Sequence, residues 1–300
     1  MRYITIKNFC AVAALISLGG CLKKNEMNID PETASSVVTL SPTGSNKATT
    51  ASTYQRYYSD FGVVKVGDHA SFNLNVEYSG GETAQSDITV NIALDTAALS
   101  KYNKQDELEY EVPPVSTIHM PSSVVIKKGT QLSQNKITID INGDYDFGAA
   151  YALPIKITSV SSGIISTNLG TSIYSFGVRN DYDGHYSMKG YSVRAGDPVK
   201  TGNFTNDDGI NLLTGGLKIV QFEDLQVWAD LTGVGIDYPV LTVNSDNTVT
   251  IVSAGGATNA PGYPSRYDPA TKTFYISFTW GTGGPTSRLA TDTLVYIKAR

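Results

Sequence analysis

The feature that most constrains the fold of this chain is an alternation of apolar and polar side chains with a period of two. Between Ser71 and Tyr78 every second residue is apolar: Phe72, Leu74, Val76 and Tyr78. Because successive side chains of a strand point to opposite faces, this pattern predicts a half-buried β-strand. Similar segments recur after turn-forming residues, at 88–94, 137–141, 151–157 and 174–178. The sequence therefore predicts an all-β protein.

The first half of the chain is predicted to form an immunoglobulin-like antiparallel β-sandwich over residues 36–180. Its short strands are separated by turns, as in the sandwich folds of that class. A single short helix is expected over residues 96–104, because Asp95 is a favourable N-cap residue and good helix formers follow it. The polar segment from Arg179 to Gly184 marks the predicted domain boundary.

The second half, residues 181–300, restarts the strand pattern and is predicted to form a small antiparallel β-barrel or a second sandwich. The expected strands share short apolar runs, at 185–191, 217–220, 225–231, 240–243, 249–252, 274–280 and 294–297. Asp246 and Asn247 predict a tight hairpin between two of these strands. No long helix is expected in this half.

The N-terminus has the pattern of an exported protein. Arg2 and Lys7 precede an apolar run, Phe9–Leu18, that is shorter than the ~20 residues needed to span a bilayer. Residues 1–20 are therefore predicted to be a signal peptide. The motif Leu18-Gly19-Gly20-Cys21 resembles the lipobox of bacterial lipoproteins, which implies that Cys21 is acylated, that residues 21–35 form a lipidated tether and that the protein is held at a membrane. The alternative is an ordinary cleaved signal peptide that happens to contain a cysteine.

Composition excludes several classes of function. The formal net charge is −5 and the basic residues form no stripe, so nucleic acid is not an expected partner. The three histidines, His69, His119 and His185, lack a metal-ligand spacing, and no nucleophile elbow or phosphate-binding loop is found. No metal, cofactor or catalytic residue is predicted. The alternating carboxylates from Glu107 to Glu111 are interpreted as a solvated face, and the aspartate pairs 144/146 and 181/183 as ordinary turns.

Several structural motifs together resemble a known family. They are Lys101-Tyr102-Asn103, Val125-Ile126-Lys127-Lys128-Gly129, Tyr151-Ala152-Leu153-Pro154-Ile155 and the run from Tyr267 to Phe274. With the lipobox, they resemble the surface lipoproteins of Bacteroidota polysaccharide-utilisation (Sus-type) systems, which have an N-terminal domain of unknown function and a C-terminal lipocalin-like β domain. The resemblance implies glycan capture at the cell surface, on the outer membrane, beside an outer-membrane transporter complex.

Candidate carbohydrate-binding residues are aromatic and polar side chains in the predicted loops of the second half. The segment 254–268 is rich in Gly, Asn and Pro, and it carries Tyr263, Arg266 and Tyr267. Trp280 precedes a loop that ends at Arg288, and Trp228 is followed closely by Asp230. Aromatic rings can stack on the apolar faces of sugars, so these residues are predicted to bind glycan. The alternative for both tryptophans is packing in the core, which is the environment also expected for Tyr186 and Tyr191.

The sequence thus favours a lipid-anchored, non-enzymatic glycan-binding protein whose ligand is a polysaccharide or oligosaccharide. A second hypothesis is a structural, adhesin-like or transporter-accessory surface lipoprotein that binds no sugar. That hypothesis predicts buried tryptophans and an exposed apolar patch. A third is a glycoside hydrolase, which would require two convergent carboxylates.

Overall fold

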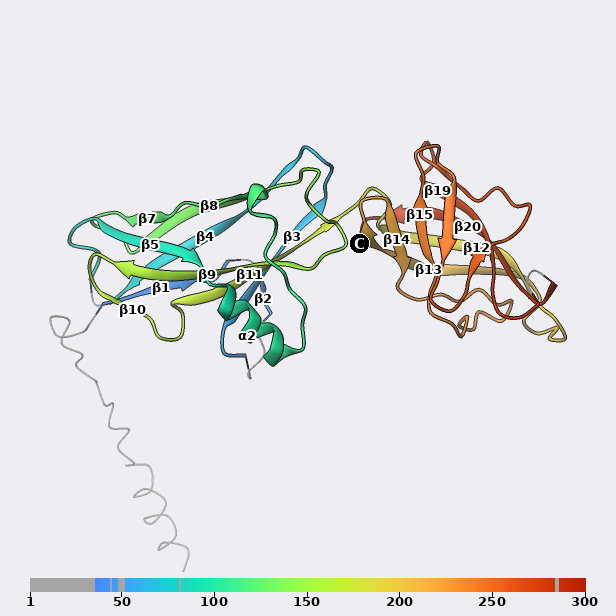
Figure 1. Cartoon of the computed structure of the whole chain (residues 1–300), viewed down its shortest axis with the longest axis horizontal. Helices are drawn as coiled ribbons and strands as arrows, with labels where there is room; N and C mark the ends of the chain where they lie inside the picture. Colours follow the sequence, from blue (N-terminus) through green and yellow to red (C-terminus); the bar gives the residue numbers. More distant parts are fainter. Residues whose placement is uncertain (1–35, 44, 48–51, 81, 284–285) are drawn as a thin grey trace, which may run out of the picture.

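The computed structural model describes residues 36–43, 45–47, 52–80, 82–283 and 286–300, which form two β-rich domains in sequence (Figure 1). The predicted signal peptide (1–20), Cys21 and the predicted tether (21–35) lie outside the described residues. Within the described residues, no helix is long and apolar enough to cross a membrane.

The first domain is a sandwich of two sheets. One sheet has the strand order β10 (Ile164–Ile165), β1 (Val37–Ser41), β4 (His69–Ser79), β8 (Leu132–Asp140) and β6 (Ile118–His119). The other has the order β2 (Ser45–Asn46), β3 (Gln55–Val63), β11 (Thr171–Arg179), β9 (Tyr151–Val160), β5 (Ile88–Leu94) and β7 (Ser123–Ile126). Side chains from both sheets meet in one core, where the rings of Phe72 and Tyr174 stack at 5.4 Å.

The prediction of a β-sandwich is confirmed, with two departures from purely antiparallel pairing. β1 pairs in parallel with β10, and β3 pairs in parallel with β11. Alternation along a strand does not reveal the direction of its neighbour, so the sequence pattern could not show these two pairings.

The predicted helix is α2 (Thr96–Asp106), two residues longer than expected. The Asp95 side chain caps it by accepting a hydrogen bond of 3.0 Å from the Ala98 amide, as its position predicts. The helix buries Leu99 and Tyr102 against the outer side of the six-stranded sheet. A short 3₁₀ helix, η1 (Val115–Thr117), follows.

The second domain is a closed antiparallel barrel, which confirms the predicted class. Its strands are β12 (Gly184–Arg194), β13 (Gly202–Gly216), β14 (Ile219–Phe222), β15 (Val240–Val243), β16 (Val249–Val252), β17 (Thr258–Asn259), β18 (Arg266–Asp268), β19 (Thr273–Thr279) and β20 (Arg288–Lys298). The sheet closes because β17 pairs with both β16 and β19. β18 extends the wall as a further partner of β19.

The barrel has two different ends. The proximal end, formed by residues 181–183, 217–218, 244–248 and 269–272, includes the segments next to the first domain. The distal end carries the loops 195–201, 223–239, 253–257 and 280–287. The strand predicted over 225–231 is wrong, because these residues lie in the 223–239 loop. Their apolar side chains, Leu225, Val227 and Trp228, turn into the barrel core instead of alternating along a strand.

The domain junction is packed. Asn180 is buried, and its amide nitrogen donates to the Gly216 and Ile219 carbonyls at 2.8 Å each. Arg179 binds the Asp60 carboxylate and the main-chain oxygen of Arg300. The Arg300 guanidinium in turn lies 3.2 Å from the buried carboxylate of Asp183.

Candidate functional site

The structure corrects the prediction for three of the six candidate glycan-binding residues. Trp228, Trp280 and Tyr267 are only 2%, 1% and 5% exposed, so they cannot present ring faces to a sugar. The two indoles pack against each other, with ring centroids 5.1 Å apart, and Tyr267 packs on Phe274 at 4.7 Å. Burying these large rings fills the barrel interior, which stabilises the fold more than exposing them would.

The other three predicted residues lie at separate places. Tyr263 is half-buried in the turn before β18. Arg266 is exposed on the outer wall of the barrel, and its guanidinium lies 4.2 Å from the ring centre of Tyr275. Arg288 is half-buried at the distal end, beside Gly281. The fold therefore does not gather the predicted residues into one site.

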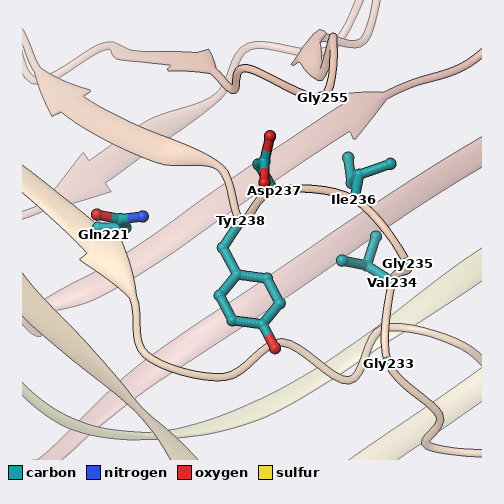
Figure 2. Close-up of a pocket in the computed structure, with 8 residues that line it drawn as sticks. All are labelled: Gln221, Gly233, Val234, Gly235, Ile236, Asp237, Tyr238 and Gly255. Atoms are coloured by element: carbon teal, nitrogen blue, oxygen red, sulfur yellow. The ribbon is translucent and has the colours of Figure 1, made fainter.

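A different set of residues forms a pocket at the distal end of the barrel, with a volume of about 650 Å³ (Figure 2). Its lining comes from the end of β14, from the 223–239 loop and from the turn after β16. The lining residues are Gln221, Gly233, Val234, Gly235, Ile236, Asp237, Tyr238 and Gly255. In Figure 2, Gln221 lies on one side of the Tyr238 ring, with Val234 and Ile236 on the other.

Tyr238 is the aromatic group of this pocket. The phenol oxygen donates a hydrogen bond of 3.2 Å to the Asp224 carboxylate, and the ring packs partly against the barrel core. Asp224 is itself fixed, because it accepts from the Leu225 amide at 2.8 Å and from the Gln226 side chain at 3.2 Å. Burial and the hydrogen bond to Asp224 raise the pKa of Tyr238. The ring is therefore held in one orientation and remains half-exposed.

Glycine residues shape the pocket wall. Gly235 has a φ of +74°, a conformation that side-chain-bearing residues rarely adopt. A Cβ atom on Gly255 would lie 2.7 Å from the Cβ of Ile236, so the turn after β16 approaches the loop closely only because this residue is glycine. The Val234 amide donates to the Leu225 carbonyl at 3.2 Å, which ties the loop back on itself.

The pocket offers chemistry suited to a polyhydroxylated ligand. Tyr238 supplies a ring face, Gln221 supplies an amide donor and acceptor, and Asp237 supplies acceptor oxygens. Among the described residues that line the pocket, Asp237 is the only charged one. This described lining therefore lacks the carboxylate pair that a glycosidase requires.

One cluster outside the pocket was not foreseen from the sequence. His69 Nδ1 and His119 Nε2 each lie 2.6 Å from a different oxygen of Asp140, on three neighbouring strands of the first domain. These two hydrogen bonds lower the pKa of Asp140, and the one from His119 has the larger effect. Among the described residues, no group of three or more His, Cys, Asp or Glu is arranged to hold a metal ion.

Sequence reasoning missed Tyr238, although a signal was present. Gly233-Val234-Gly235-Ile236-Asp237-Tyr238 combines glycines with an aromatic residue, which is the criterion applied to 254–268. The apolar run 225–231 predicts a strand, and this pattern conceals the length of the loop that carries Tyr238.

Comparison with known proteins supports the fold. Residues 35–164 match a protein-family model described as "-like, N-terminal domain". No curated protein matches the chain. A solved protein of unknown function from Bacteroides ovatus is similar over 88% of this chain and 95% of its own, with a TM-score of 0.56 and 14% identity. Its similarity extends over both domains and therefore supports the two-domain fold.

Two more distant structures are also similar. An auxiliary nutrient binding protein from Bacteroides thetaiotaomicron has a TM-score of 0.43 and 15% identity, over 79% of this chain and 89% of that one. A candidate carbohydrate binding protein from Bacteroides ovatus has a TM-score of 0.39 and 14% identity, over 80% of this chain and 78% of that one.

Proposed function

We propose that this protein binds neutral carbohydrate in the distal pocket of its barrel and does not cleave it. The observation that carries the proposal is the oriented, half-exposed ring of Tyr238 in an open pocket with one amide and one carboxylate at its edge. Sugars present flat C–H faces surrounded by hydroxyl groups, so a ring face with polar groups beside it matches both parts of such a ligand. The pocket volume of about 650 Å³ lies within the range of small-molecule sites.

The proposed setting is the surface of the outer membrane, where acylated Cys21 would anchor the chain beside a transporter complex. The lipobox-like motif Leu18-Gly19-Gly20-Cys21 and the resemblance to Sus-type lipoproteins support this placement. One aromatic platform and a few hydrogen bonds give weak binding, on the order of millimolar to micromolar Kd. Weak binding suits a protein that must release its ligand to a transporter.

The test is affinity electrophoresis and calorimetry against a panel of neutral polysaccharides and their oligosaccharides. With any glycan that binds, Tyr238→Ala should raise Kd about 2- to 12-fold, which corresponds to the loss of about 0.5–1.5 kcal/mol of ring contact. Tyr238→Phe keeps the ring and should bind within about 2-fold of the unmodified protein.

Tyr263→Ala is the matched control, because Tyr263 is a half-buried loop tyrosine of the same barrel that does not line the pocket. If Tyr263→Ala loses glycan binding and Tyr238→Ala retains it, the binding site lies in the segment 254–268 predicted from the sequence. Failure of every glycan in the panel to bind would contradict the proposal.

A second candidate function is a structural or transporter-accessory role without sugar binding. The burial of both Trp228 and Trp280 is the outcome that this hypothesis predicts. It expects no glycan binding by the whole panel, together with co-purification of an outer-membrane partner. The same binding experiment therefore decides between the two functions.

A further inference from the structure

The outer wall of the barrel carries a second set of exposed polar and aromatic side chains, separate from the distal pocket. The strand register places them in two neighbouring rows across β13, β12, β20, β19 and β18. One row consists of Thr205, Lys189, Thr293, Tyr275 and Arg266. The next row contains Asn203, Tyr191 and Thr291. We refer to these eight residues as the outer-wall face.

Two tyrosines on this face are not used by the core. Tyr191 is 43% exposed, although its position in a strand predicted burial. The prediction was wrong because Tyr191 is on the outward side of β12, whereas Tyr186 faces inward and is buried, as predicted. Tyr275 also points outward from β19 and is half-exposed. An exposed ring beside threonine hydroxyls offers a sugar chain both an apolar contact surface and hydrogen-bonding groups.

Arg266 is held in position by Tyr275. Its guanidinium lies over the Tyr275 ring, 4.2 Å from the ring centre, so the aromatic face restricts the orientation of the planar group. The Arg266 side chain makes no hydrogen bond or ion pair within the part of the chain that the structure describes. Its N–H donors are therefore available, and a guanidinium is suited to bidentate binding of a carboxylate.

The eight residues of the outer-wall face include two cations and no carboxylate, on a protein whose net charge is −5. Lys189 lies in the same row as Arg266, and it too has no ion-pair partner among the described residues. The nearest acidic residue along β18, Asp268, interacts electrostatically with Arg266, while its carboxylate accepts hydrogen bonds from the Ala270 amide at 2.9 Å and the Thr271 hydroxyl at 3.0 Å. The exposed Asp207 and Asp208 follow Asn206 on β13 and border the face next to Thr205.

We propose that the outer-wall face binds an oligosaccharide that carries carboxylate groups, such as a chain of uronic acids. Lys189 and Arg266 lie three strands apart, about 14 Å between Cα atoms, so one extended chain of sugars can reach both. The cations would bind the carboxylates, Tyr191 would contact a sugar face and the threonines would bind hydroxyls. The distal pocket has the opposite character, because its one charged lining residue is Asp237. The proposal does not depend on sugar binding in the pocket.

The test uses an oligogalacturonide of about four sugars and its methyl ester, which keeps the rings and removes the charge. Calorimetry on the full chain should show millimolar to micromolar binding of the acid and at least about 5-fold weaker binding of the ester. Lys189→Gln and Arg266→Gln should each weaken binding of the acid by at least about 3-fold, and the double variant by about 10-fold. Raising sodium chloride from about 0.05 M to about 0.5 M should also weaken it, because exposed charges are screened.

Lys136→Gln, at an exposed lysine of β8 in the first domain, is the matched control and should leave binding unchanged. Tyr191→Ala should weaken binding of both the acid and the ester. This result would separate the contribution of the ring from that of the charges. Thermal unfolding of each variant confirms that it is folded. The proposal is overturned if the acid does not bind, if the acid and the ester bind equally, or if Lys136→Gln reduces binding as much as Lys189→Gln.

Discussion

At the scale of single residues, Asp292 is the group with the clearest energetic consequence. Its side chain is completely buried in the barrel interior on β20, and neither carboxylate oxygen has a hydrogen-bond partner among the described residues. It fits there because the opposite residue on β12 is Gly190, where a Cβ atom would lie 2.5 Å from the Asp292 oxygen. Burial raises the pKa of Asp292 well above its usual value and so favours the protonated carboxyl group in the folded barrel.

The predicted effect of this group is a loss of stability as pH rises. The unfolded chain releases the proton near the usual pKa of aspartate, whereas the folded barrel retains it. The free energy of unfolding should therefore fall by up to about 1.4 kcal/mol per pH unit from about pH 4 until the pH reaches the raised pKa of the folded state. Asp292→Asn removes this titration, so we expect higher stability at pH 7 and a flatter pH dependence.

Urea unfolding at several pH values, followed by tryptophan fluorescence, measures this effect. Both tryptophans lie in the barrel core, so the signal reports on that domain. Asp207→Asn is the control, because Asp207 is exposed on the same barrel. An equal pH dependence of the unmodified protein and Asp292→Asn would show that Asp292 is ionised in the folded state.

At the scale of elements, the distal pocket depends on how the 223–239 loop meets the turn after β16. Gly255 is the contact point. A Cβ atom added to it would lie 2.7 Å from the Ile236 Cβ and 3.1 Å from the Asp237 amide nitrogen. Gly255→Ala should displace the part of the loop that carries Ile236, Asp237 and Tyr238. The barrel strands should remain folded, because the change affects a turn outside the main ladders.

We therefore expect Gly255→Ala to weaken glycan binding in the pocket at least as much as Tyr238→Ala does, with a smaller effect on stability than a core substitution. Calorimetry with the best-binding glycan and thermal unfolding measure the two effects. Gly143→Ala is the control, because a Cβ on Gly143 meets no atom within 4 Å. Unchanged binding by Gly255→Ala would mean that the loop geometry is not required.

At the scale of the whole molecule, the junction determines whether the two domains move as one body. Arg179, on β11 of the first domain, donates to the Arg300 main-chain oxygen at the end of the barrel, and Asp60 on β3 of the same domain holds its guanidinium in place. Its side chain is largely buried, unlike the exposed pair of Lys65 and Asp181, 3.7 Å apart at the same junction. Buried hydrogen-bonded charges contribute more than exposed pairs, so Arg179 is expected to dominate the coupling.

Arg179→Ala should loosen the junction, with a loss of about 1–3 kcal/mol of coupling. Small-angle X-ray scattering should then show a broader distribution of domain orientations, and the two domains should unfold in more widely separated transitions. Lys65→Ala should have little effect on either measurement. Identical scattering by Arg179→Ala and the unmodified protein would show that other contacts hold the domains together.

The sequence was sufficient for much of this architecture because the determining interactions are local. The period-two alternation from Phe72 to Tyr78 corresponds to β4, and Asp95 caps α2 where expected. Alternation alone could not assign the run 225–231, whose side chains enter the barrel from a loop. It also could not bring His69 and His119 together on Asp140, because they come from strands far apart in the chain.

The proposed binding surfaces depend on contacts between distant segments, so the sequence pattern could not predict them. Strand periodicity and turn residues are enough to predict two β domains with aromatic residues both within and between the strands. Long-range packing then places Trp228, Trp280 and Tyr267 inside the barrel, while Tyr238, Tyr191 and Tyr275 remain accessible. The physical reason is that burial of a ring depends on which distant segments cover it, and closure of the barrel determines that cover through contacts between residues far apart in sequence.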